Sequence, residues 1–420
     1  MKFFHKLTNS KQLQNFSIYG IGQLFNLLTP LLVAPYVIII CGEEGFGKAG
    51  IGLSFVFILT VLVDFASGIK GVKDVSVFRD DTKKVQKIGN ILFSIKLIML
   101  LLILFFASIV IILIPFLYQE KELFFLSLVF LVSQAFNPTW FLQGLEKFKI
   151  ISALSISGKI LYIFLVLTLV TSKGDYIYVN FYLGISALFV HLIGMGWLIK
   201  NKFLVLEKPE KAELISIFSR DYKLTLSQLL LSLQQYSPIL IVGFFGNSFL
   251  AGQYKIIEQI IMIFRTYLQV LFNFIFPRVC FLLAKDNKRG IHNWKIFNGA
   301  NFFLILIGCL ILFVFAPEVL GFFNATNSKE LTFYLRFASF SPLFYALSIP
   351  LQQLVLGYNY QKQYVNITTT AAVFLIVTII AVFSFWQLIG IFSILILTEV
   401  IVIIMYLYTL RKNLFNNPIS

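Results

Sequence analysis

Residues 88–116 read IGNILFSIKLIMLLLILFFASIVIILIPF, an apolar run that contains a single charged residue, Lys96. A helix needs roughly 20 mostly apolar residues to cross the hydrocarbon core of a bilayer, so this run is long enough to span a membrane. Similar runs recur along all 420 residues, of which 59% are hydrophobic and only 13% are charged. Soluble domains are about 25% charged, and no soluble fold of this size could bury so much apolar surface. The composition therefore predicts an all-α integral membrane protein and excludes soluble enzymes and nucleic-acid-binding proteins.

Breaks rich in charged residues, Gly, Pro or Asn divide the chain into twelve such runs. The predicted transmembrane helices cover residues 14–40, 49–69, 88–116, 123–142, 150–170, 179–199, 224–246, 252–277, 296–316, 331–356, 365–385 and 387–410. The first run is too long for the apolar region of a signal peptide, so we expect it to be retained as the first span.

The basic residues predict the orientation of these helices. The chain has 34 Lys and Arg residues against 19 Asp and Glu residues, which gives a formal net charge of +15. With the N-terminus inside, 25 of the 34 fall in cytoplasmic segments and only Lys48, Lys121, Lys173 and Lys329 fall outside. Because Lys and Arg collect in cytoplasmic loops, we expect both termini to be cytoplasmic. Most of the net charge is thereby explained by topology.

An internal repeat divides the chain into two halves. GEEGFG at 42–47 lies between the first two predicted helices, and GNSFLAG at 246–252 lies between the seventh and eighth. Six helices per half would give both halves the same orientation, as in one of the repeat arrangements of transporters. We predict two pseudo-symmetric six-helix bundles, an N-terminal half at 1–200 and a C-terminal half at 224–420, joined by a cytoplasmic linker at 201–223.

Two segments resemble a known family. The first is GEEGFG at 42–47, followed by LVDF at 62–65 and VFRDD at 77–81; the second is NPTWFLQGLEKFK at 137–149. Both resemble the bacterial polysaccharide-repeat-unit flippases, or O-antigen flippases, of the multidrug/oligosaccharidyl-lipid/polysaccharide exporter superfamily. The related lipid II flippases carry an arginine on the first span, whereas residues 15–40 here have no charge.

The resemblance implies a transporter and not an enzyme. Its cargo would be an undecaprenyl-diphosphate-linked oligosaccharide, moved by alternating access from the cytoplasmic to the outer leaflet of the bacterial inner membrane for O-antigen, capsule or exopolysaccharide synthesis. The family also implies contact with membrane lipid and work beside a polysaccharide polymerase and a chain-length regulator. Coupling to a proton or a sodium ion stays open.

Two other functions are alternatives. One is a cation-coupled drug exporter of the same superfamily, and the other is a membrane enzyme that polymerises or ligates lipid-linked sugars. The longest predicted outer loop, 317–330, is short for such an enzyme, and a net positive interior suits a diphosphate better than a cationic drug.

Ionisable and amide residues inside the spans are candidate substrate-binding residues, because charge in the bilayer is costly unless it faces a cavity or a partner. On the eighth span, Lys255, Glu258, Arg265 and Gln269 lie on one helical face at a spacing of about 3.6 residues. Arg265 lies near the expected bilayer centre, with Glu258 as its expected charge neighbour on that face. The remaining candidates are Gln23 and Asn26 on the first span, Lys96, Lys159 and Gln235. Interhelical hydrogen bonds and snorkelling are the alternative explanations.

Three residues are candidates for ion coupling. His191 and Glu399 lie near the middle of the sixth and twelfth spans and can change charge, although an interhelical hydrogen bond is the alternative for both. Asp64, on the second span, could instead be a helix-packing partner of Lys70 or Lys96. The sequence has no GxxxxGK[ST] motif, and its three cysteines are far apart, so we expect no nucleotide, cofactor or metal.

Overall fold

The computed structural model describes residues 11–205, 207–325 and 329–416, and every regular element in these ranges is a helix. The α-helices of the N-terminal part are α2 (Lys11–Asp64), α3 (Val72–Val77), α4 (Thr82–Leu113), α5 (Pro115–Gln119), α6 (Lys121–Ser127), α7 (Val129–Ala135), α8 (Thr139–Gly144), α9 (Phe148–Leu169) and α10 (Tyr176–Lys200). They are followed by α11 (Lys211–Phe245), α12 (Ser248–Lys285), α13 (Asn287–Val314), α14 (Ala316–Phe322), α15 (Lys329–Ala338), α16 (Ser341–Gly357) and α17 (Gln361–Asn416). A π-helical turn, Ser67–Gly71, precedes α3, and a 3₁₀ turn, Lys173–Asp175, precedes α10.

Nine helical stretches of the described residues are long and apolar enough to cross a bilayer. They are Leu28–Asp64, Thr82–Leu113, Lys121–Gly144, Phe148–Leu169, Lys173–Lys200, Lys211–Phe245, Asn287–Val314, Lys329–Gly357 and Gln361–Arg411. Helix α12, which carries the polar face of the eighth predicted span, is not among them. The chain is therefore an all-helical, multi-pass membrane protein.

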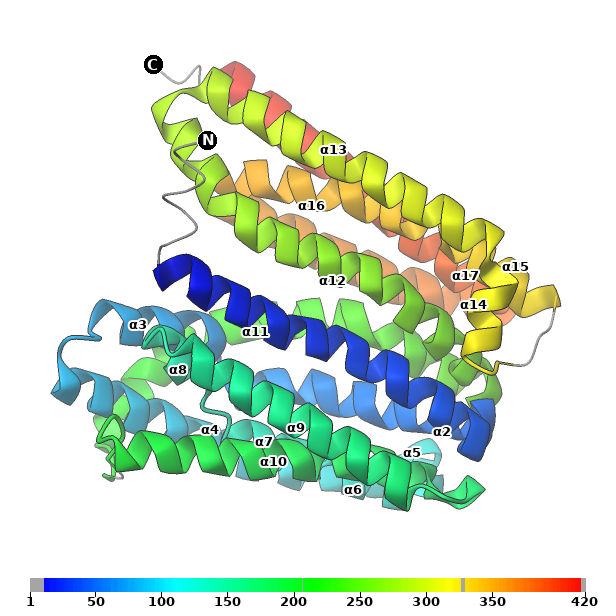
Figure 1. Cartoon of the computed structure of the whole chain (residues 1–420), viewed down its shortest axis with the longest axis horizontal. Coiled ribbons are helices and arrows are strands. Elements are labelled where there is room, and N and C mark those ends of the chain that lie inside the picture. The colour runs from blue at the N-terminus through cyan, green and yellow to red at the C-terminus, as the bar shows by residue number, and fades with distance from the viewer. Residues whose placement is uncertain (1–10, 206, 326–328, 417–420) are drawn as a thin grey trace. The chain divides into compact units, whose positions relative to one another are not determined.

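Two of the long helices are interrupted at a single residue. Helix α2 leaves the helical conformation at Gly42 (φ 75°, ψ 170°), and α17 does so at Gln387 (φ 44°, ψ −131°). Figure 1 shows each as two helical segments that meet at a turn. Glycine adopts a positive φ without steric cost, whereas Gln387 is strained there. Each of these helices thus covers two of the predicted spans, 14–40 with 49–69 and 365–385 with 387–410.

Two predicted spans are broken into shorter helices. The span at 123–142 forms α6, α7 and the start of α8, and the span at 331–356 forms α15 and α16. Before α8, Asn137 Oδ1 accepts a hydrogen bond from the backbone N–H of Thr139 at 2.9 Å, next to Pro138, which has no N–H to donate. After the second break, Pro342 lies in the first turn of α16.

The contacts divide the chain into two compact units, residues Met1–Ser232 and Leu233–Ser420. In the first unit α10 packs against α2, α6, α7 and α9; in the second, α16 packs against α12, α13 and α17. The division lies within α11, whose first residues, Lys211–Lys223, coincide with the second part of the predicted linker.

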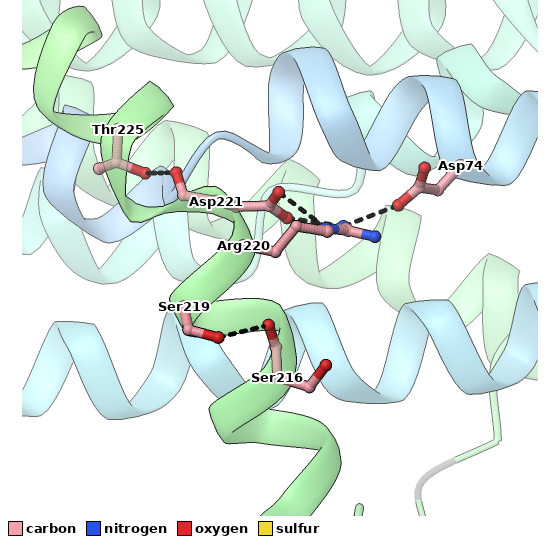
Figure 2. A network of polar contacts seen from close by, with 6 residues as sticks. All are labelled: Asp74, Ser216, Ser219, Arg220, Asp221 and Thr225. Carbon is pink, nitrogen blue, oxygen red and sulfur yellow. Dashed lines mark hydrogen bonds and ion pairs between the residues drawn. The ribbon is translucent and has the colours of Figure 1, made fainter.

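The beginning of α11 is fixed to the first unit by an arginine (Figure 2). Arg220 Nε donates to Asp221 Oδ1 at 2.8 Å, and Arg220 Nη2 donates to Asp74 of α3 at 2.9 Å. Arg220 Nη2 also donates to Asp221 Oδ2 at 2.6 Å, and because the Asp221 side chain is only 1% exposed, its charge requires this bidentate partner. The first part of α11 therefore belongs to the N-terminal unit.

Residues 77–81, which end the first of the two segments that carry the family resemblance, lie next to the second segment in the N-terminal unit. Trp140 and Phe141 are buried in one cluster with Val75 and Phe93, and Arg79 forms an ion pair with Glu146 at 2.6 Å. The motif residues around α8 thus pack against α3.

Glycines allow close helix contact around α10. A Cβ atom added at Gly184 would lie 2.7 Å from the backbone nitrogen of Phe130 in α7, and one added at Gly158 of α9 would lie 3.0 Å from Val190 Cγ2. Helices α7, α9 and α10 can therefore approach closely enough to enclose a space between them.

We expect Gly184→Ala to lower the free energy of unfolding by about 1–3 kcal/mol, because the backbone of α7 must move to admit the methyl group. Gly196→Ala in the same helix is the matched control, since a Cβ there meets nothing within 4 Å. Alanine at this control position should raise helix stability by up to about 1 kcal/mol. Unfolding of both variants in detergent, followed by circular dichroism, checks the prediction, and equal effects would contradict the close approach of α7 and α10.

Candidate functional site

The N-terminal unit contains a cavity of about 230 Å³ between α2, α7, α9 and α10. Polar side chains from four helices line it: Asn26, Gln134, Ser152, Ser155, Lys159 and His191. Ser155 Oγ donates to Asn26 Oδ1 at 3.3 Å, which links α9 to α2 across the wall. Hydroxyl and amide groups can both donate and accept hydrogen bonds, so the lining suits a highly polar ligand.

Lys159 is a cation without a counter-ion in this cavity. Among the described residues, no side chain forms an ion pair or a hydrogen bond with it. A partly buried ammonium group in an apolar helix is costly, and an anionic ligand is the partner that would offset the cost. Ser152 and Ser155, which share its face of α9, line the same space, as their spacing predicts.

Lys96 shows the opposite arrangement. Its side chain is only 1% exposed, and its ammonium nitrogen lies 3.0 Å from Asp64 Oδ1 at the end of α2. Asp64 therefore pairs with Lys96 across two helices, which is one of the helix-packing alternatives given above for Asp64. The pair is neutral overall, so Lys96 adds little net charge to its surroundings.

His191 completes the wall of the cavity on α10. Its Nδ1 lies 2.7 Å from the backbone carbonyl oxygen of Ser133 in α7. Since a carbonyl oxygen can only accept, Nδ1 carries a proton, and Nε2 is the nitrogen left for a ligand. The sequence predicts ion coupling for His191 and substrate binding for Lys159, and the fold brings both residues into one cavity.

The C-terminal unit has a smaller cavity, of about 40 Å³, that contains Arg265. The guanidinium carbon lies 5.2 Å from the centre of the Tyr345 ring, in a cation–π contact. Glu258 and Gln235 also line this cavity. Glu258 Oε2 accepts a hydrogen bond from Lys255 Nζ at 2.6 Å, so this pair is neutralised and Arg265 has no acidic partner within ion-pair distance among the described side chains.

The other predicted residues are more scattered. Glu399 of α17 lies near Ser348 of α16. Gln269 is exposed and does not line the smaller cavity. Gln23 lies in α2, and its side chain is outside the described part of the structure. No group of three or more His, Cys, Asp or Glu residues in the described ranges could hold a metal ion.

Sequence reasoning missed several residues of the two cavities. Gln134 lies in a mostly apolar predicted span, three residues before Asn137, whose side chain donates a hydrogen bond to it at 2.9 Å. Its position in the sequence therefore indicated a polar site. The positions of Tyr254 and Tyr345 gave no such indication, because an aromatic residue in a membrane helix is equally compatible with packing.

Comparisons with known proteins agree with this architecture. The family described as "Polysaccharide biosynthesis protein" matches residues 12–281. A "Putative O-antigen transporter" of Escherichia coli (strain K12) is 22% identical over 414 residues, which cover 97% of this chain and 98% of the relative. A protein of the same name from Shigella dysenteriae is 21% identical over 267 residues, which cover 63% of this chain and 65% of the relative.

Solved transporter structures share the fold. An inward-facing multidrug resistance MATE family transporter of the MOP superfamily has a TM-score of 0.70 at 15% identity, with 96% of this chain and 98% of that chain covered. The lipid II flippase MurJ in an inward closed conformation has a TM-score of 0.72 at 12% identity, covering 94% and 87%. At these identities the likeness establishes the fold alone.

The Asp64–Lys96 pair yields a stability prediction. Asp64→Asn leaves the buried Lys96 charge uncompensated and should cost about 3–5 kcal/mol of unfolding free energy, whereas the double variant Asp64→Asn, Lys96→Met should be close to wild type. Unfolding of purified protein in detergent measures both. If the double variant is as unstable as Asp64→Asn alone, the loss of stability does not come from the uncompensated charge of Lys96.

Proposed function

Because this chain belongs to the polysaccharide biosynthesis protein family, we propose that it is a flippase for undecaprenyl-diphosphate-linked oligosaccharide units. It moves these units from the cytoplasmic to the outer leaflet of the bacterial inner membrane by alternating access, for O-antigen, capsule or exopolysaccharide synthesis. The polysaccharide polymerase and the chain-length regulator of that process would act on the units after their transfer.

The observation that carries this proposal is the unpaired cation Lys159 in the larger cavity. A partly buried ammonium group without a counter-ion lowers the stability of the fold. Such a group can bind an anionic ligand through charge-assisted hydrogen bonds. The diphosphate is the charged group of a lipid-linked oligosaccharide. We assign the diphosphate to the cavity of Lys159, together with Asn26 and the serine hydroxyls of α9.

The cavity of the C-terminal unit is suited to a second polar group. The Arg265 guanidinium stacks on Tyr345, and Gln234 and Gln235 add amide donors and acceptors beside it. Amides match sugar hydroxyls, and aromatic rings offer apolar surface to the faces of a sugar. Lys255 and Glu258 neutralise each other, so they would contribute hydrogen bonds more than net charge.

The number and orientation of the membrane passes are also part of this proposal. We propose twelve passes with both termini cytoplasmic, since the excess of Lys and Arg on one side orients membrane helices. In this arrangement the six-helix halves at 1–200 and 224–420 flank a cytoplasmic linker at 201–223. The interruptions at Gly42 and Gln387 support the count, because each allows one continuous helical stretch to supply two passes.

Ion coupling would involve a residue that can change charge near a cavity. His191 fits because it lines the cavity of Lys159, and Glu399 fits because it can hold or lose a proton beside Ser348. Asp64 is less suited, since Lys96 already neutralises it.

A cation-coupled drug exporter is the competing function, and the shared fold with a multidrug MATE transporter is the observation that favours it. The electrostatics oppose it. A cationic drug would be repelled by Lys159, which has no acidic partner among the described residues. Loss of resistance to cationic drugs in the deletion strain, with normal surface polysaccharide, would support this alternative.

Deletion of the gene tests the main proposal. We expect lipid-linked repeat units to accumulate on the cytoplasmic side and surface polysaccharide to be lost, because the polymerising steps outside would receive no units. Extracted lipid-linked sugars and surface polysaccharide can both be measured by gel electrophoresis and mass spectrometry. Normal surface polysaccharide in the deletion strain would refute a flippase role.

Single substitutions test the two cavities. Lys159→Ala and Arg265→Ala should each reduce export about tenfold or more, because each removes a charge-assisted contact worth roughly 1.5–3 kcal/mol. The matched control is Lys208→Ala, an exposed residue of the loop before α11. Lys159→Ala should also leave the protein at least as stable as wild type, since it removes an uncompensated charge. Reduced stability with unchanged export per folded molecule would instead indicate a structural role.

A further inference from the structure

We propose that His191 takes up one proton when a diphosphate binds beside Lys159, so that the loaded cavity has no net charge. This inference rests on the proposed function and adds a step to it. The hydrogen bonding of the imidazole ring and the sum of charges around the cavity support it.

The ring is held so that only one nitrogen can change its protonation. Nδ1 donates to the Ser133 carbonyl oxygen at 2.7 Å, and it does so in both the neutral and the protonated ring. Nε2 therefore has a free lone pair in the neutral form and a proton in the charged form. Among the described residues, no group forms a hydrogen bond with Nε2. In the charged form it becomes a donor for a ligand in the cavity.

The charges around the cavity favour this step only when the ligand is present. The diphosphate of a lipid-linked sugar is a diester with two negative charges, and Lys159 supplies one positive charge. Lys96 adds no net charge, because it forms an ion pair with Asp64 at 3.0 Å. One proton on His191 brings the total to zero. A neutral complex avoids most of the cost of placing net charge in a low-dielectric environment.

The groups that face His191 from the neighbouring helices are few. Lys159 of α9 and Lys96 of α4 both interact with it electrostatically, and Lys96 carries its counter-ion from α2. Helices α2 and α7 contribute the uncharged Asn26 and Gln134 to the cavity wall. Burial, and to a smaller extent repulsion from Lys96 and Lys159, opposes an imidazolium ion in the empty cavity, and the two ligand charges favour it.

The proton transfer is simple in chemical terms. The Nε2 lone pair forms an N–H bond with a proton from a hydronium ion, or from a buffer acid that is left as its conjugate base. The new N–H donates to a phosphoryl oxygen. When the diphosphate leaves, the imidazolium ion beside Lys159 loses the same proton to water.

Isothermal titration calorimetry of the full-length protein in detergent tests the proposal. The probe is farnesyl diphospho-N-acetylglucosamine, a diphosphate diester whose phosphates do not titrate near neutral pH. Titrations in two buffers of different ionisation enthalpy give the number of protons taken up on binding. We expect close to one proton between pH 7 and 8, and an affinity that falls about tenfold for each pH unit over this range.

Two histidine variants sharpen the test. His191→Gln should bind the probe with no proton uptake and with an affinity independent of pH, because glutamine keeps an amide but cannot ionise. His292→Gln is the matched control; His292 is exposed on α13, outside the cavity, and its replacement should leave the uptake at one proton.

The outcomes separate this inference from the function on which it rests. Binding to the wild type without proton uptake would overturn the inference and leave the diphosphate site intact, and this result does not depend on whether His191→Gln folds. Equal proton uptake by wild type and His191→Gln would also overturn it. If folded wild-type protein does not bind the probe, the assignment of the cavity to the diphosphate fails as well.

Discussion

The cost of an uncompensated charge in hydrocarbon governs the arrangement of polar residues in this protein. A charge within a membrane helix has to meet a counter-ion, reach the interface or face a polar space. Lys96 meets Asp64 and Lys255 meets Glu258, so both are neutralised within the fold. Lys159 and Arg265 have no acidic partner within ion-pair distance among the described residues, and both line cavities. The same physical constraint thus distinguishes charges that are neutralised within the fold from charges that are available to a ligand.

The unpaired charges of the two units lie in different surroundings. In the N-terminal unit the unpaired charge lies in a cavity of about 230 Å³ with an imidazole and several small polar side chains. In the C-terminal unit Arg265 rests on the face of Tyr345 in a cavity of about 40 Å³. A compact ammonium group suits phosphoryl oxygens as a point charge, whereas a planar guanidinium group stacked on a ring is held in one orientation. The sequence repeat therefore does not imply equal chemistry in the two halves.

The helix packing that creates the larger cavity depends on backbone contacts. Gly184 brings α10 against the backbone of α7, and Gly158 brings α9 against Val190. Hydrophobic attraction contributes little between helices in lipid, so small residues and interhelical hydrogen bonds determine which helices approach closely. The Asn137–Pro138 break separates α7 from α8, and the Trp140 motif of α8 packs against α3. The motif that carries the family resemblance is thus part of the packing of the N-terminal unit.

The sequence by itself determined that the chain is an all-helical membrane protein, because the length and apolarity of its runs leave no other fold for the backbone hydrogen bonds in lipid. It also placed Lys159, with Ser152 and Ser155, on one helical face, since the helical period fixes which residues share a face. Only the tertiary structure decided which cations are neutralised. Asp64 and Lys96 lie 32 positions apart, and no local pattern specifies that they meet. The same holds for His191 and Lys159, which come from α10 and α9 and share a cavity only because glycines let these helices pack closely. Helical periodicity fixes directions around one axis, whereas pairing depends on how several axes pack.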